Sequence, residues 1–324
     1  MNERSDFDQG PENGARSGGD ERNEGHRART RVAVLGTGRM GAAIAQRLKA
    51  GGFQVSVWDR TKAKAEALHV GRVAESPADA TRKADVVISM VTGPQAVREV
   101  YFGPEGVFEA AANKTIIEMS TAGPGVALEL AHAAALNGAR LIEAPVMGSV
   151  PAVLGGTLVI LAGAAVAEDL EAARPVLQRL GEVHHVGGLG SAPALKLIVN
   201  SLLAIVSAAA AELMAAGTRL GLDREQVFWA LTRIAPGFKV REAGFVRNVH
   251  EPTLFAMRDM LKDLDLGLSL YGRASGSDST SPLTSVTREL FARVASQAPG
   301  LDLSAIVNAY STYLPLERQR KEVA

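Results

Sequence analysis

Short apolar runs alternate with helical stretches through the first half of the chain. Runs typical of buried strands occur at residues 32–35, 54–58, 86–88, 115–117, 140–142, 158–161 and 183–186. Helical periodicity fills most of the intervals, at residues 42–50, 62–69, 94–101, 124–136 and 167–179. Because continuous apolar runs are typical of parallel strands covered on both faces, this pattern predicts a doubly wound α/β sheet over residues 31–190.

The second half has a different pattern, because the strand signals stop at about Gly190. A long helix rich in Ala and Leu is expected over residues 193–218, and Asp223 is placed to cap the next helix. Further helices are expected at residues 224–233, 238–247, 257–273, 283–297 and 303–312. Strands followed by helices predict an all-α C-terminal domain over residues 191–316, with the active site in the cleft between the two domains.

A glycine-rich turn follows the first predicted strand and opens the first helix: Gly36-Thr37-Gly38-Arg39-Met40-Gly41. Gly36 permits a tight turn, Gly38 lets the backbone approach a pyrophosphate, and Gly41 lets the helix pack closely on the strand. The free N–H groups at the start of the helix favour an anionic ligand. This context predicts a Rossmann-type sheet that binds a dinucleotide.

The end of the second predicted strand bears on which dinucleotide is bound. Asp59 can accept hydrogen bonds from ribose hydroxyls, which favours NAD, and its charge would repel a 2′-phosphate. Arg60 and Thr61 follow directly, and a guanidinium with a hydroxyl suits that phosphate. We expect NADP, with NAD as the alternative, and interpret Lys62 and Lys64 as part of a solvated helix face.

Lys196 and Asn200 stand four residues apart near the start of the long predicted helix, so they share one face. The neighbouring residues are apolar, and an ammonium group in such surroundings loses solvation. Its pKa then falls toward the range in which a lysine can act as an acid or base at neutral pH. A lysine in a helix is usually solvated, and the position of Lys196 at the predicted domain junction, next to a glycine-rich turn, strengthens the catalytic interpretation.

Two loops of small residues follow neighbouring predicted strands, at residues 120–124 and 144–149. Open α/β sheets bind ligands at the carboxyl ends of their strands, so these loops are candidates for a substrate site. Their hydroxyls and free N–H groups can hold a carboxylate, although plain strand-to-helix turns have the same composition. The candidate substrate-binding residues are Ser120, Thr121, Met147, Gly148 and Ser149.

Composition narrows the function to small-molecule chemistry. Lys and Arg number 35, as do Asp and Glu, so no positive excess favours nucleic-acid binding. Cysteine is absent, and the six histidines show no metal-ligand spacing, so no metal site is predicted. The most apolar later stretch, residues 201–211, is too short to cross a membrane. Residues 1–30 are polar and charged and lack an apolar signal segment, which predicts a disordered tail and a cytoplasmic protein.

Taken together, the motifs resemble the β-hydroxyacid dehydrogenase family, which includes 3-hydroxyisobutyrate dehydrogenase and glyoxylate/succinic semialdehyde reductase. The resemblance extends from Arg31 to about Leu314. The matching elements are Val34 to Gly41, Ser120-Thr121 with Pro124, Ala144 to Ser149, Gly190 to Asn200 with Lys196, Lys262-Asp263-Leu264, and Asp302 to Ala305. Without the resemblance, Lys262 and Asp263 would be interpreted as a solvated charge pair on a helix.

The resemblance implies an NAD(P)-dependent oxidoreductase that transfers a hydride between nicotinamide and a small hydroxyacid or its aldehyde or keto-acid partner. Lys196 would be the catalytic acid/base, and Asn200 would orient the lysine or the substrate. Substrate carboxylate and carbonyl would be held by Ser120, Thr121, Gly148, Ser149 and Asn200. The cofactor would be touched by Val91, Thr92 and Thr121, and Lys262 would close over it. A homodimer or higher homo-oligomer is expected.

The sequence departs from the family pattern at Met147-Gly148-Ser149, where many members have Ser-Gly-Gly. Gly-Ser at this place is more similar to the glyoxylate/succinic semialdehyde branch. An imine or other carbonyl reductase acting on a less polar substrate is the alternative enzyme, and Met147 facing the cleft would favour it. A non-catalytic dinucleotide sensor or scaffold that uses residues 1–30 is the alternative of another class. Lys196 with Asn200 argues against both.

Overall fold

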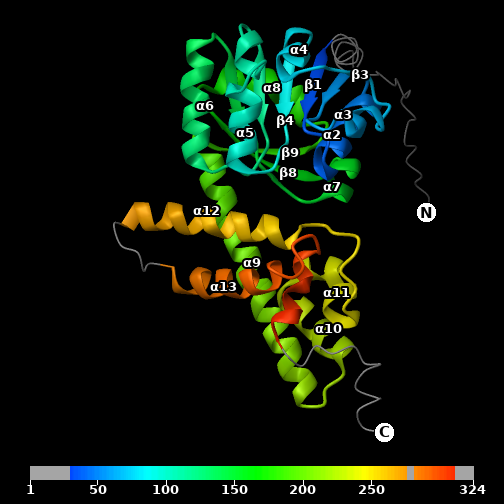
Figure 1. Ribbon diagram of the computed structural model, residues 1–324. Coiled ribbons are helices and arrows are strands. Elements are labelled where there is room, and N and C mark those ends of the chain that lie inside the picture. The colour runs from blue at the N-terminus through cyan, green and yellow to red at the C-terminus, as the bar shows by residue number, and fades with distance from the viewer. Residues whose placement is uncertain (1–29, 276–280, 311–324) are drawn as a thin grey trace, which may run out of the picture.

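The computed structural model describes residues 30–275 and 281–310, which form a half built on a sheet and a half built of helices (Figure 1). The sheet has nine strands in the order β3-β2-β1-β4-β5-β6-β8-β7, with β9 paired to β8. Their bounds are β1 (Arg31–Leu35), β2 (Gln54–Trp58), β3 (Arg72–Val73), β4 (Val86–Ser89), β5 (Thr115–Glu118), β6 (Arg140–Glu143), β7 (Val146–Met147), β8 (Leu158–Ala164) and β9 (Gly181–Gly187).

In the run β3-β2-β1-β4-β5-β6 each strand is parallel to the next, with Val34 of β1 opposite Val57 of β2 and Ile88 of β4. The strand β8 runs antiparallel to β6 and β7 and parallel to β9. The carboxyl ends of β1, β4 and β5 therefore meet at one edge of the sheet. Ligands bind at this edge in open α/β folds.

Helices cover both faces of the sheet. One face carries α2 (Arg39–Ala50), α3 (Lys62–Glu66), α7 (Val150–Gly155) and α8 (Ala167–Leu177). The other carries α4 (Pro77–Arg82), α5 (Gly93–Phe102), η1 (Val107–Ala110) and α6 (Pro124–Leu136). Successive side chains of β1 enter the two separate cores, because Val32 and Val34 pack with Ile44 whereas Ala33 and Leu35 lie on the opposite face.

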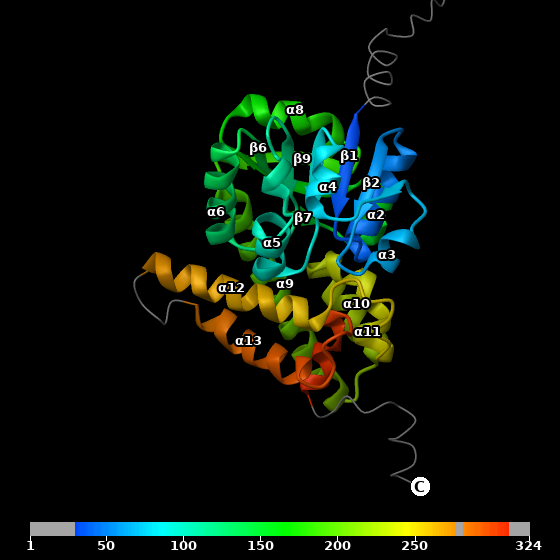
Figure 2. The ribbon, with the colours of Figure 1, turned by 45° about the horizontal axis from the view of Figure 1, so that its top comes forward.

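The second half of the chain is helical and has its own core around Met214, Phe245 and Phe291. It contains α9 (Ser191–Arg219), α10 (Arg224–Ile234), η2 (Pro236–Arg241), α11 (Glu242–Arg247), α12 (Met257–Ser275), α13 (Pro282–Ala295) and η3 (Leu303–Ala309). By length and composition α9 could cross a membrane, but it packs along one side against α12, α13 and η3. Figure 1 shows α9 leading out of the sheet-bearing half, and Figures 1 and 2 both show α12 below that half.

The predicted alternation and the change to helices are confirmed, but several short elements were missed. These are β3, β7, α4 and α7, which are too short to show a periodic pattern. The expected helix at 238–247 is divided into η2 and α11, and the one at 303–312 is the tighter η3. The predicted tail, as far as residue 29, and residues 311–316 of the predicted helical domain lie outside the described residues.

Candidate active site

The glycine-rich turn is closely packed on one side and open on the other. Gly36 has a φ of +89°, and a Cβ there would lie 2.5 Å from Met90 O. A Cβ on Gly41 would lie 1.9 Å from Gly36 O, so neither position accepts a side chain. At Gly38, by contrast, no atom lies within 4 Å of such a Cβ. Space is therefore open where a pyrophosphate would approach the first turn of α2.

Asp59 fixes this turn through its carboxylate. One oxygen accepts hydrogen bonds from Thr37 N at 2.8 Å and Thr37 Oγ1 at 3.0 Å, and the other accepts one from Thr61 N at 2.8 Å. Both oxygens are thus engaged by the protein itself. The Arg60 side chain is 83% exposed, and its Nη1 lies 3.4 Å from a carboxylate oxygen of Glu99. An exposed ion pair of this kind is weak, so a phosphate can replace Glu99 as the partner of Arg60.

A cavity of about 610 Å³ lies between the carboxyl edge of the sheet and the helical half. The glycine-rich turn, the loops after β4 and β5, and α12 all contribute to its lining. The lining residues are Thr37, Gly38, Arg39, Met40, Gly41, Ala42, Lys64, Met90, Val91, Thr92, Gly93, Ser120, Thr121, Val150, Leu254, Phe255, Arg258, Asp259, Lys262 and Asp263. Lys64 is exposed as expected for a solvated face, yet it also borders this cavity.

Several predicted site residues do not line this cavity. Met147 belongs to β7 and pairs with Val159, so the expected loop at 144–149 is partly a strand. Gly148 has a φ of +123°, and a Cβ there would lie 2.8 Å from Leu158 Cδ2, so the backbone at this position requires glycine. Ser149 precedes α7, and the cavity is bordered from here only by Val150. Because Met147 does not border the cavity, it lends no support to a less polar substrate.

Asp263 is the residue whose importance the sequence did not reveal. It is 1% exposed, which makes the interpretation of Lys262 and Asp263 as a solvated pair wrong. Its two carboxylate oxygens accept hydrogen bonds from Asn200 Nδ2 and from Lys262 Nζ, each at 2.5 Å. Lys262 Nζ also donates to Thr121 O at 2.9 Å, so this lysine links α12 to the loop after β5.

Lys196 lies near this buried carboxylate. Burial lowers the pKa of Lys196 to about 8, the negative charge of Asp263 opposes that shift, and the positive charge of Lys262 adds to it. Within the described residues, no hydrogen bond engages the Lys196 ammonium. Neither Lys196 nor Asn200 is among the residues that line the large cavity, and Asn200 bonds to Asp263 rather than to Lys196.

A second buried carboxylate, Glu118, holds the loops at the sheet edge. It accepts hydrogen bonds from Ser120 N at 2.7 Å and from Ser89 Oγ, while the Ser89 hydroxyl also bonds to Tyr101 OH at 2.6 Å. Ser120 Oγ accepts a hydrogen bond from Val91 N at 2.9 Å. Burial raises the pKa of Glu118. The sequence signal for this network was an acid at the end of an apolar strand, directly before a candidate loop.

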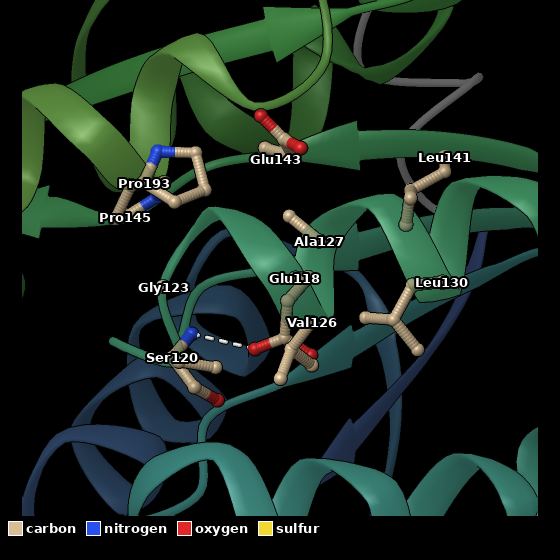
Figure 3. Close-up of a pocket in the computed structure, with 11 residues that line it drawn as sticks. Glu118, Ser120, Gly123, Val126, Ala127, Leu130, Leu141, Glu143, Pro145 and Pro193 are labelled. Carbon is tan, nitrogen blue, oxygen red and sulfur yellow. Dashed lines mark hydrogen bonds between the residues drawn. The ribbon is translucent and has the colours of Figure 1, made fainter. Parts of the chain in front are cut away.

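A small internal cavity lies between Glu118, Ser120, Glu143 and Pro193 (Figure 3). At about 10 Å³ it has room for one water molecule. Glu143 accepts hydrogen bonds from Gly190 N at 2.7 and 2.8 Å, which ties the end of β6 to the start of α9. Burial raises the pKa of Glu143 to about 7, although its hydrogen bonds from Gly190 and Ala192 oppose the shift.

Comparison with known proteins adds family information. Residues 31–188 match the NAD binding domain of 6-phosphogluconate dehydrogenase, and residues 190–310 match the family described as NAD-binding of NADP-dependent 3-hydroxyisobutyrate dehydrogenase. A 3-hydroxyisobutyrate dehydrogenase of Pseudomonas aeruginosa is 34% identical over 87% of this chain and 98% of its own. Glyoxylate/succinic semialdehyde reductase 1 of Arabidopsis thaliana is 32% identical, over 86% of this chain and 97% of its own. The solved 3-hydroxyisobutyrate dehydrogenase of Mycobacterium tuberculosis has a TM-score of 0.76 and 29% identity, and covers 87% of this chain and 99% of that one.

Proposed function

Because the chain belongs to the β-hydroxyacid dehydrogenase family and is an NAD(P)-dependent oxidoreductase of hydroxyacids, we propose that Lys196 is its proton donor and acceptor. The observation that carries this proposal is the environment of the lysine. Its ammonium has a pKa of about 8, lies near the Asp263 carboxylate, and has no competing hydrogen bond in the described part of the chain. A group with this pKa exchanges protons readily near neutral pH.

The proton chemistry follows from that pKa. Bound nicotinamide supplies or accepts the hydride. When a carbonyl is reduced, negative charge develops on its oxygen, and the Lys196 ammonium stabilises that charge and donates a proton to the oxygen. When the alcohol is oxidised, the neutral amine accepts the hydroxyl proton. Asp263 keeps a negative charge beside Lys196 and is itself held by Asn200 and Lys262, so Asn200 acts on the lysine through Asp263.

The proposed substrate is a small hydroxyacid or its aldehyde partner, such as glyoxylate or succinic semialdehyde. Ser120 and Thr121 border the large cavity at the carboxyl end of β5, which supports their role at the substrate carboxylate. Met147, Gly148 and Ser149 do not line this cavity, and Val150, the next residue, is the part of this segment that borders it. Val91, Thr92 and Lys262 border it too, as the proposed cofactor contacts require.

The proposed cofactor is NADP, with NAD as the alternative. The residues fit a dinucleotide, because the turn is open at Gly38 and closed at Gly36 and Gly41. Asp59 already accepts three hydrogen bonds from Thr37 and Thr61, so its charge is used to hold the turn. Arg60 and Thr61 would then hold a 2′-phosphate, with Lys64 nearby at the cavity border.

A homodimer is the proposed assembly, because α9 carries an uncovered apolar face. Its exposed members follow helical spacing: Ile198, Leu202, Ala209 and Leu213. Ile198, Leu202 and Leu213 are more than half exposed in the single chain. A contiguous apolar stripe of this length is typical of a surface that packs against another chain.

The deciding experiment compares the wild-type protein with Lys196→Ala. Glyoxylate, succinic semialdehyde, tartronate semialdehyde and 3-hydroxyisobutyrate are each assayed with NADP(H) and NAD(H). The proposal expects turnover of at least one substrate, and loss of that turnover in the variant while cofactor fluorescence still reports binding. Lys239→Ala, on an exposed position of η2, is the matched control and should keep its activity. Undiminished turnover in Lys196→Ala would refute the assigned proton donor.

A further inference from the structure

One stretch of main chain, residues 253–255, joins the helical half to the large cavity. We call it the wall segment. Its members Leu254 and Phe255 border the cavity together with Lys262 and Asp263 of α12. Phe255 also packs, partly buried, against the core of the helical half. The position of this segment therefore sets the shape of the cavity on the side facing away from the sheet.

The buried carboxylate of Asp302 holds the wall segment by its backbone. One oxygen accepts hydrogen bonds from Leu254 N and Phe255 N, each at 3.0 Å. The other accepts hydrogen bonds from Ser304 N at 3.0 Å and from Arg241 Nε at 3.1 Å. The Asp302 side chain is only 4% exposed and that of Arg241 10%, so this ion pair is shielded from solvent. Shielded, charge-assisted bonds of this kind fix geometry more strongly than exposed ones.

The other end of the wall segment is held by the glycine-rich turn. Arg39 stands between Gly38 and Met40 in that turn, and its Nη1 donates a hydrogen bond to Thr253 O at 2.9 Å. Arg39 itself borders the cavity. One guanidinium thus joins the turn that would hold the cofactor pyrophosphate to the segment that carries Leu254 and Phe255, across 214 residues of sequence.

We propose that Arg39 and Asp302 are positioning residues that set substrate selectivity through the wall segment. This inference rests on the proposed function, since it concerns which hydroxyacids or aldehydes the same site accepts. Arg39 ties the wall to the cofactor turn, and Asp302 ties it to the helical core. Loosening either contact lets Leu254 and Phe255 move, so the enzyme discriminates less well between a short and a longer substrate.

The test measures the ratio of kcat/KM for glyoxylate to kcat/KM for succinic semialdehyde at saturating cofactor. At saturating cofactor, a change in cofactor affinity affects both kcat/KM values equally and leaves their ratio unchanged. A changed ratio in an Arg39 variant therefore reports the wall segment and not cofactor binding. Arg39→Gln and Asp302→Asn are each expected to change the ratio by about fivefold, chiefly through KM, because each removes a charged hydrogen-bond partner. Arg39→Lys should restore part of the wild-type ratio.

The double variant separates a shared mechanism from two unrelated effects. If both residues act on the wall segment, combining Arg39→Gln with Asp302→Asn changes the ratio by clearly less than the product of the single effects. Asp223→Asn is the matched control, because Asp223 caps α10 in the same half of the protein but does not border the cavity. It should lower the melting temperature without moving the ratio.

The outcomes distinguish this inference from the proposed function. If the wild-type protein turns over neither aldehyde with either nicotinamide, the proposed function is overturned. If it turns over both and the ratio stays within about twofold of wild type in Arg39→Gln and Asp302→Asn, the wall-segment inference alone is overturned. Should Asp302→Asn fail to fold, the ratio measured in Arg39→Gln and Phe255→Ala still tests the wall-segment inference. Both variants keep the hydrogen bonds of Asp302 that support η3.

Discussion

The side-chain amide of Asn200 donates its hydrogen bond to Asp263 at a distance of 2.5 Å. The two residues are 63 positions apart, on α9 and α12, and both are almost fully buried. Asp263 also receives the Lys262 ammonium and faces the charge of Lys196. The group that tunes the proposed proton donor is therefore a carboxylate on a different helix, supported by the amide that shares a helix face with the lysine.

Replacing Asp263 by Asn should move the pH dependence of reduction. The carboxylate favours the charged form of Lys196, so its removal lowers the pKa of the lysine below about 8. Reduction needs the ammonium, and its rate falls as pH rises through that pKa. The alkaline limb of kcat/KM should therefore shift to lower pH by about one pH unit. Asp265→Asn, an exposed position on the same helix, should leave the limb in place, and an upward shift in Asp263→Asn would contradict this electrostatic account.

Lys196→Ala should lose turnover by about 10²- to 10⁴-fold, the range expected for a lost general acid. Cofactor affinity should remain near that of wild type, because Lys196 does not line the cavity that contains the glycine-rich turn. Stopped-flow turnover and a fluorescence titration with NADPH measure the two quantities separately. A parallel loss of cofactor binding would indicate that the lysine has a structural role instead.

Arg60→Ala should weaken NADPH binding by about tenfold and leave NADH binding nearly unchanged, since a phosphate contact of this kind is worth roughly 1.5 kcal/mol. Titration of both nicotinamides by fluorescence gives the two dissociation constants. Lys62→Ala is the control, because Lys62 is already paired with Glu75 at 2.8 Å. An equal loss for both nicotinamides would show that Arg60 does not contact the 2′-phosphate.

Glu143→Gln should stabilise the protein above neutral pH. The folded-state pKa of Glu143 is about 7, against a reference value of 4.5, so the folded protein binds this proton more tightly than the unfolded chain does. The free energy of unfolding therefore falls as pH rises from about 4.5 to about 7, by at most roughly 3 kcal/mol from this group. Below that window wild type and variant should be equally stable.

Urea unfolding of both proteins at about pH 4, below the window, and at pH 8 measures that difference. Glu129→Gln, at an exposed carboxylate paired with Arg98, is the control and should not gain stability at pH 8. If Glu143→Gln is less stable than wild type at pH 8, the hydrogen bonds from Gly190 N to the carboxylate stabilise the fold by more than burial of the charge destabilises it.

Leu202→Glu and Leu213→Glu should each convert the proposed dimer to a monomer, because a charge in the middle of an apolar interface stays unpaired. Light scattering after size-exclusion chromatography gives the mass directly. Leu136→Glu, at a 75% exposed position on α6, should leave the mass unchanged. A wild-type protein that elutes as a monomer would remove the basis for this assembly.

The sequence by itself determined the features that depend on local patterns. Apolar runs and helical periodicity were enough for the doubly wound sheet and the change to helices, because burial on both faces or on one stripe is visible in neighbouring residues. The glycine-rich turn could also be recognised, since Gly41 meets Gly36 O within one strand–turn–helix unit, whereas the close contact of Gly36 with Met90 comes from the loop after β4. The two-residue strands β3 and β7 and the short helices α4 and α7 carried too little periodicity to be predicted.

Only the tertiary structure decided which polar groups meet. Lys262 and Asp263 had the pattern of a solvated pair, and burial between α9 and the loop after β5 made them part of the candidate site. Asp302 and Arg39 each contact the wall segment from distant parts of the chain. Such pairings depend on the packing of whole elements, and a buried charge finds its partner through space, where sequence separation gives no signal.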